Sequence, residues 1–186
     1  MNSLLFTIFS AVCGQNPAHA WAPGGHTLPC CERCAGLYAG ALAAMVLRLW
    51  FRPPADGRSL KIHAFFLLQL GLFVLPWAPQ WPALRTISGA LFGFGVVAFL
   101  WPAVADWLPE AKGSPHAGVA YGLGLASCLV LTPAIAAWGG AAGAFLLTWL
   151  LLCGLVGLFA LAGANLVRCL VSVGAFFCFD RHSFDS

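Results

Sequence analysis

The sequence predicts an all-α, polytopic transmembrane helix bundle, and two observations lead to this prediction: its composition and its long apolar runs. Of the 186 residues, 61% are hydrophobic and only 8% are charged, whereas an average soluble domain has about 25% charged residues. The mean hydropathy is +0.87. So few charged side chains cannot cover the surface of a soluble protein of this size. We therefore expect a lipid bilayer around the chain.

Five apolar runs approach or exceed the length of about 20 residues that crosses a bilayer. The expected spans are 34–51, 62–77, 86–108, 117–138 and 142–167. The apolar runs 4–12 and 169–179 are too short to cross and are expected to form interfacial helices. The chain is thus one integral membrane domain over 1–186, with an N-terminal helix and loop (1–33), about five spans (34–167), and an interfacial helix with a cytoplasmic tail (168–186).

Small residues favour close helix packing in lipid. Three G-x-x-x-G motifs are expected to provide such surfaces: Gly36 with Gly40, Gly89 with Gly93, and Gly139 with Gly143.

Polar residues and prolines inside the spans need a structural explanation. Gln69 lies in the middle of the second expected span and should form a hydrogen bond with another helix. Arg85 and Asp106 are close enough to the ends of the third span to reach the headgroups. Pro102 and Pro133 should kink their helices.

The Lys and Arg residues predict the topology. Arg33 and Arg85 fall on one side of the five spans, and the other seven of the nine cations fall on the opposite side: Arg48, Arg52, Arg58, Lys61, Lys112, Arg168 and Arg181. By the positive-inside rule, the C-terminus is cytoplasmic and the loop before the first span is extracytoplasmic, as in a multi-pass protein of a bacterial inner membrane. A net charge of +3, widely scattered, does not favour nucleic acid as a partner.

Most chemistry-bearing side chains gather in the one long irregular segment, 13–33, and at the start of the first span. They are Cys13, His19, His26, Cys30, Cys31 and Cys34. Cys31 and Cys34 form a C-x-x-C pair at the N-terminal end of a helix. The helix end and the neighbouring Arg33 should stabilise a thiolate, and Gly24-Gly25 with Pro29 should let the loop fold back toward Cys13.

Three interpretations of this cluster remain open. Cys13, Cys31 and Cys34, with His19 or His26 as a fourth ligand, suit zinc or a single iron; Cys30 is the alternative fourth ligand. In the second interpretation, Cys31 and Cys34 exchange electrons with a thiol substrate, as in a membrane thiol-disulfide oxidoreductase. In the third, an inert disulfide or zinc clip pins the loop to the first span.

A short pattern resembles a known family. Cys13-Gly-Gln15-Asn-Pro17, followed by Leu28-Pro29-Cys30-Cys31-Glu-Arg33-Cys34-Ala-Gly36-Leu-Tyr38-Ala-Gly40, is similar to the bacterial membrane proteins grouped as domain of unknown function 2085. The stretch Arg85-Thr-Ile-Ser-Gly89 resembles the family's weaker second motif. Members commonly have a histidine and an arginine where this chain has Gly14 and His19.

The resemblance implies a small polytopic membrane protein with no assigned reaction. It also implies a core of three cysteines, which fits a metal better than a lone disulfide. We therefore expect an extracytoplasmic Cys/His site that binds zinc or iron. The alternatives are an accessory subunit of a larger membrane complex and the thiol-disulfide oxidoreductase. No carboxylate pair or Ser/His/Asp set indicates a class of enzyme.

Overall fold

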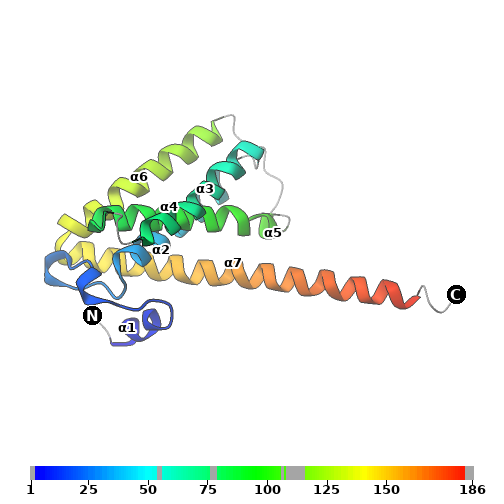
Figure 1. Cartoon of the computed structure of the whole chain (residues 1–186), viewed down its shortest axis with the longest axis horizontal. Helices are drawn as coiled ribbons and strands as arrows, with labels where there is room; N and C mark the ends of the chain where they lie inside the picture. The colour runs from blue at the N-terminus through cyan, green and yellow to red at the C-terminus, as the bar shows by residue number, and fades with distance from the viewer. Residues whose placement is uncertain (1–2, 54–55, 76–78, 106, 108–115, 183–186) are drawn as a thin grey trace.

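The computed structural model is an all-α bundle and describes residues 3–53, 56–75, 79–105, 107 and 116–182 (Figure 1). This confirms the predicted fold class. The helices are α1 (Ser3–Ser10), α2 (Glu32–Phe51), α3 (Gly57–Val74), α4 (Pro82–Leu100), α5 (Pro102–Ala105), α6 (Ala117–Trp138) and α7 (Gly140–His182). Two short 3-10 helices, η1 (Pro17–His19) and η2 (Pro23–Gly25), lie in the loop before α2.

Four of the described helices are long and apolar enough to cross a membrane: α2, α4, α6 and the first 33 residues of α7. The second expected span is also a helix, α3, with 18 residues, but it is not among these four. Arg58, Lys61 and His63 occupy its first two turns and lower its hydropathy. By length and composition, the described part of the chain therefore has four candidate spans rather than five.

Helix α2 lies against α4 at backbone distance, and the two share the most extensive contact in the bundle. A Cβ atom added at Gly36 of α2 would lie 1.9 Å from the carbonyl oxygen of Thr86. A Cβ atom at Gly93 of α4 would lie 2.3 Å from the carbonyl oxygen of Leu37. The other glycine of each motif makes a similar approach, since a Cβ atom would lie 2.3 Å from the Ala90 carbonyl oxygen at Gly40 and 2.1 Å from the Arg33 carbonyl oxygen at Gly89. The predicted packing role of these two motifs is therefore confirmed.

The third motif, Gly139-x-x-x-Gly143, does not pack one helix on another in this way. A Cβ atom at Gly139 would meet the carbonyl oxygen of Ile135 at 2.5 Å and Cα of Gly143 at 2.8 Å. Ile135 lies in the last turn of α6 and Gly143 in the first turn of α7, so Gly139 stands at the junction of two consecutive helices. The prediction was wrong here because the motif spans a turn rather than one helix face. Helix α7 instead approaches α2 at Gly154, where a Cβ atom would lie 2.1 Å from the carbonyl oxygen of Tyr38.

Helix α3 packs on the other side of α4. The side-chain amide of Gln69 donates to the carbonyl oxygen of Ser88 at 2.8 Å, which confirms the expected hydrogen bond between helices. Helix α4 ends at Leu100, and Pro102 begins the separate helix α5, so the third expected span is interrupted before 108. Asp106 and Leu108 lie outside the described residues.

Pro133 lies inside α6, which continues through it to Trp138.

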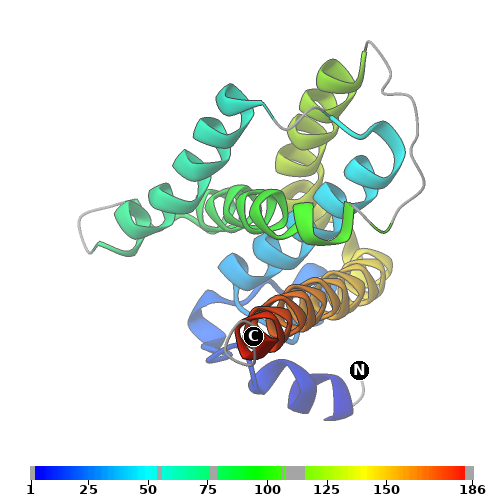
Figure 2. The same ribbon diagram turned by 90° about the vertical axis from the view of Figure 1, so that its right-hand side faces the viewer.

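Helix α7 corrects the expectation of a separate short helix after Arg168. It continues without a break from Gly140 to His182, over 43 residues, because no proline interrupts this stretch and one arginine does not end a helix. At about 1.5 Å per residue the helix is about 65 Å long, about twice the hydrocarbon core of a bilayer. Figure 1 shows its C-terminal part extending past the end of the bundle, and Figure 2 shows the same helix nearly end-on.

The bundle has two distinct ends. The loop before α2 packs against the turn between α6 and α7, since η2 contacts both of these helices. At the opposite end, the guanidinium of Arg168 donates to the carbonyl oxygens of Pro102 and Ala103, each at 3.3 Å. The cysteine-containing loop and the basic end of the bundle are therefore separated by the length of α2.

We predict that Gly36→Ala destabilises the protein, because the new methyl group would overlap the Thr86 carbonyl and overpacking costs about 1–3 kcal/mol or more. Thermal unfolding in detergent should show a lower Tm. Gly122→Ala is the matched control, since Gly122 lies in α6 and a Cβ atom there meets nothing within 4 Å. Equal Tm values for the two variants would contradict the close packing of α2 on α4.

Candidate metal centre

Three thiol groups converge at the N-terminal end of α2. The sulfur atoms of Cys13, Cys31 and Cys34 all lie within 4.8 Å of one another, and no other histidine, cysteine or carboxylate of the described residues joins them at this distance. Sulfur atoms bound tetrahedrally to one zinc ion at about 2.3 Å lie about 3.8 Å apart. A small inward movement of three side chains would therefore bring all three sulfurs to one ion.

Cys13 is held in place by the residues around it. It follows α1, and its N–H donates to the carbonyl oxygen of Phe9 at 2.9 Å. The side-chain amide of Gln15, whose φ is +45°, donates to the carbonyl oxygens of Phe6 at 2.7 Å and Pro29 at 2.8 Å. Gln15 thus ties α1 to the segment that leads into the C-x-x-C pair.

The Cys13 sulfur is also an acceptor of backbone hydrogen bonds. The N–H of Gln15 donates to it at 3.5 Å and the N–H of Cys31 at 3.3 Å. These two donors belong to the loop backbone, so they hold the Cys13 sulfur beside the start of α2.

The loop between Cys13 and Cys31 folds back over the helix ends. It brings Cys13 to the C-x-x-C pair as expected, but the expected histidine is not part of the group among the described residues. Ala20 and Cys31 form an antiparallel bridge, and the indole N–H of Trp21 donates to the Thr86 hydroxyl of α4 at 2.8 Å. Gly24 has a φ of +58°, and a Cβ atom there would lie 2.7 Å from the backbone nitrogen of Ala141. A side chain at position 24 would hold the loop away from the start of α7.

The thiols of the cluster and the adjacent Cys30 differ in acidity. The pKa of Cys31 is lowered to about 5, first by a hydrogen bond from the Cys34 thiol and further by the Cys13 thiol and the backbone at the start of α2. Burial raises the pKa of Cys30 well above its ordinary value, and the charges of Cys13 and Cys31 add to this effect. Cys31 is therefore the reactive thiolate at neutral pH, and Cys30 remains protonated.

Arg33 acts on Cys31 in two ways. Its backbone N–H contributes to the lowered pKa of Cys31, and its charge interacts favourably with that of Cys31. Its guanidinium donates to the carbonyl oxygen of Phe73 and to Gln80 Oε1 at 3.1 Å, so Arg33 also binds the C-terminal end of α3.

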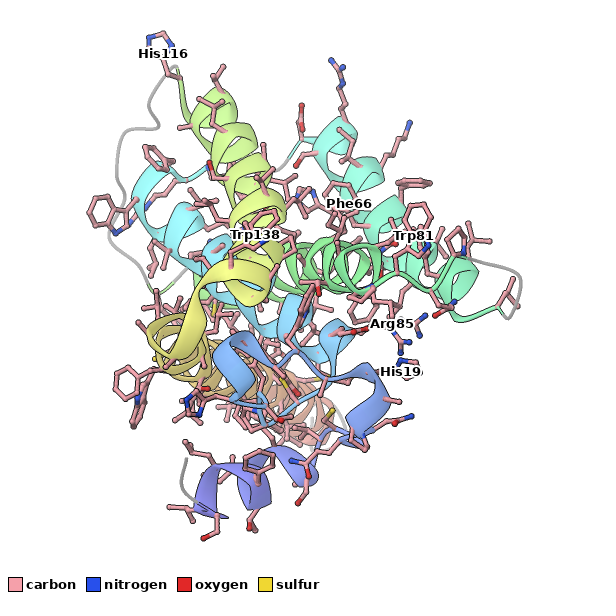
Figure 3. All side chains as sticks on the ribbon, turned by 90° about the vertical axis from the view of Figure 1, so that its left-hand side faces the viewer. His19, Phe66, Trp81, Arg85, His116 and Trp138 are labelled. Atoms are coloured by element: carbon pink, nitrogen blue, oxygen red, sulfur yellow. The ribbon has the colours of Figure 1, made fainter. Side chains whose placement is uncertain are left out.

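The other three predicted ligands lie outside the group of sulfur atoms. His19 lies beside Arg85 (Figure 3), close enough for both charges to act on Glu32. His26 is exposed. Cys30 is buried in an apolar cluster that includes Phe9, although the charges of Cys13 and Cys31 act on it.

Glu32 is a residue of the site whose role the sequence analysis missed. Its Oε2 lies 3.2 Å from Nε of Arg85, and both side chains are buried. The expectation that Arg85 reaches the headgroups was therefore wrong, because an acidic group at the start of the neighbouring apolar helix binds it. A carboxylate in an apolar span requires a cationic partner, and this rule could have indicated the pair. The ion pair joins the N-terminal ends of α2 and α4 beside the thiols.

Comparison with known proteins agrees with a membrane protein. Residues 13–99 match the family described as "Predicted membrane protein (DUF2085)". This match covers just under half of the chain, from Cys13 to the end of α4, and it confirms the resemblance to that family. It contains all three converging cysteines, Gln15, and the Glu32–Arg85 pair.

One relative is archaeal. The chain is 27% identical to the uncharacterized protein MJ1492 of Methanocaldococcus jannaschii over 107 residues, which are 53% of this chain and 67% of the relative. No solved structure matches the chain.

We predict that Cys31 is the first thiol of metal-free protein to react with iodoacetamide. Its alkylation rate should rise through pH 5 and level off by about pH 7, because the thiolate is the reactive form and the pKa is about 5. Mass spectrometry of peptides checks the order, with Cys30 as the internal control that stays slow at neutral pH. A rate that still rises steeply above pH 8 would show that the Cys31 pKa is not lowered.

Proposed function

We propose that Cys13, Cys31 and Cys34 together bind one zinc or iron ion. The observation that carries this proposal is the convergence of three thiols from two segments, within 4.8 Å. A disulfide needs only two of these cysteines and gives no reason for the third to be there. The backbone hydrogen bonds to the Cys13 sulfur hold it near the other two thiols, and the acidity of Cys31 further supports a thiolate site.

The donor set restricts the metal. Three thiolates are soft ligands that suit zinc or iron far better than magnesium or calcium. The fourth position would be taken by water or by a further residue. Cys30, His19 and His26 are the candidates for that residue, and each requires a rearrangement of the loop.

A bound metal would fasten three parts of the fold together. Cys13 belongs to the segment after α1, Cys31 ends the loop, and Cys34 lies in the first turn of α2. One ion would therefore hold α1 and the loop on the end of α2, in a structural or a functional role. A water in the fourth position would be the feature that distinguishes a functional site.

The proposed site lies on the extracytoplasmic side of a bacterial inner membrane, with the C-terminus in the cytoplasm. The distribution of Lys and Arg along the sequence supports this orientation, which counts α3 as a fifth crossing. The Glu32–Arg85 pair joins the N-terminal ends of α2 and α4, so α3 carries the chain back between the two ends of the bundle. A membrane-impermeant maleimide should label Cys31 on intact cells after metal removal. Labelling that requires lysis would reverse the orientation.

A second candidate function is thiol-disulfide exchange at Cys31 and Cys34. The lowered pKa of Cys31 favours it, because an exchange reaction begins with a thiolate. The role of an accessory subunit of a larger membrane complex also remains a proposal, and co-purification of a stoichiometric partner after mild solubilisation would support it.

Elemental analysis of protein purified in detergent tests the metal proposal. We expect about one zinc or iron per chain in the unmodified protein, and less than about a tenth of that in Cys13→Ser, Cys31→Ser or Cys34→Ser. Cys153→Ser is the matched control and should retain the metal, since Cys153 is an exposed thiol of α7 that is not among the three converging cysteines. Cys30→Ser, His19→Ala and His26→Ala identify any fourth ligand.

Metal-free protein with two thiols that can be alkylated only after reduction would contradict the metal proposal. If those two thiols are Cys31 and Cys34, that result would support the exchange reaction instead. Equal metal loss in Cys153→Ser would show that the loss reflects general unfolding.

A further inference from the structure

A cavity with several polar side chains in its lining lies at the opposite end of α2 from the three thiols. It has a volume of about 230 Å³ and is lined by side chains from α2, the start of α3, α4 and α5: Arg48, Asp56, Gly57, Ser59, Leu60, His63, Ala98 and Pro102. One water molecule occupies about 30 Å³ of liquid. The cavity therefore has room for a group the size of a phosphate.

Arg48 is the unusual residue of this cavity. It is only 5% exposed, and its buried Nε has no hydrogen-bond partner. No carboxylate of the described residues lies within salt-bridge distance of its guanidinium, which lies over the ring of Tyr121 with Cζ 5.5 Å from the ring centroid. A buried charge without an opposite charge is costly, and within the described part of the chain the charge of Arg48 has no ion-pair partner.

The neighbouring polar groups satisfy one another. Nδ1 of His63 lies 2.7 Å from the carbonyl oxygen of Ser59, and its Nε2 lies 2.9 Å from the Tyr121 hydroxyl. A carbonyl can only accept, so Nδ1 carries the proton and neutral His63 accepts the Tyr121 hydroxyl at Nε2. His63 and Tyr121 thus brace the cavity wall. The Arg48 side chain also forms a hydrogen bond with Tyr121, and its Nε is the donor that has no partner among the described residues.

The start of α3 adds positive potential to the same cavity. The N-terminal end of an 18-residue helix attracts anions through its dipole and its N–H groups. Asp56, the one acidic residue of the lining, is exposed and accepts the Ser59 N–H at 2.8 Å as the N-cap of α3. Arg58 and Lys61, both exposed, lie in the first two turns of α3 but do not line the cavity.

We propose that this cavity binds a phosphate group, with Arg48 as its ion-pair partner and the N-terminus of α3 as a second contact. The site is independent of the thiol cluster. Two sources share this chemistry: the headgroup of an anionic phospholipid, and a free phosphate from the aqueous phase. Arg48 lies within the last turn of α2, and a lipid phosphate lies at the corresponding level of a membrane.

Binding to the full-length, delipidated protein in detergent tests the proposal. The probes are phosphatidylglycerol, counted as adducts by native mass spectrometry, and inorganic phosphate, measured by calorimetry at constant ionic strength. Diacylglycerol is the lipid control without a phosphate. We expect Arg48→Gln to weaken binding at least tenfold, because a charge-assisted hydrogen bond is lost. The matched control, Arg58→Gln, removes one exposed cation near the same helix end and should leave binding within about twofold.

Each outcome is decisive. Arg48-dependent binding of phosphatidylglycerol alone supports a lipid headgroup, and Arg48-dependent binding of inorganic phosphate alone supports a soluble anion. Binding of both supports a site for the phosphate group itself. Failure of both probes to bind, or equal affinity in Arg48→Gln, would overturn the proposal. If Arg48→Gln does not fold, hydrogen exchange of the unmodified protein decides: the probe should slow exchange in 57–63, and unchanged exchange would overturn the proposal.

Discussion

The backbone contact between α2 and α4 is the constraint on which the other features of the molecule depend. Side chains larger than hydrogen at Gly36 and Gly93 would overlap carbonyl groups of the partner helix. Once the helices are this close, Glu32 can reach Arg85 and Trp21 can reach Thr86. These contacts fix the start of α2, and the positions of Cys31 and Cys34 follow from it.

Both proposed sites use α2, at its two ends. Cys31 precedes the helix and Arg48 lies in its last turn, so the sites are about 25 Å apart at about 1.5 Å per residue, close to the thickness of a hydrocarbon core. The first site collects soft thiolates on a loop fastened by Gln15. The second is a cationic cavity formed where the helices α3 and α5 begin. The different donor chemistry of the two ends predicts different ligands.

Local patterns in the sequence predicted most of the helices and the choice of the three cysteines that converge. Long apolar runs indicate helices whatever they pack against, and a C-x-x-C pair at a helix start holds its two sulfurs near each other. Local patterns do not predict the positions of His19 and Arg85, because both depend on Glu32. Glu32 becomes a neighbour of Arg85 only after α2 and α4 pack. The uninterrupted course of α7 was missed because a charged residue, Arg168, was taken to end the helix.

X-ray absorption spectroscopy at the metal edge of the purified protein tests the central claim most directly. A site formed by Cys13, Cys31 and Cys34 predicts three sulfur scatterers at about 2.3 Å, with a fourth contribution from nitrogen, oxygen or sulfur. The spectrum of the Cys153→Ser protein should be the same. A first shell made up only of nitrogen and oxygen would contradict a metal centre at these cysteines, even in a protein that contains one metal ion per chain.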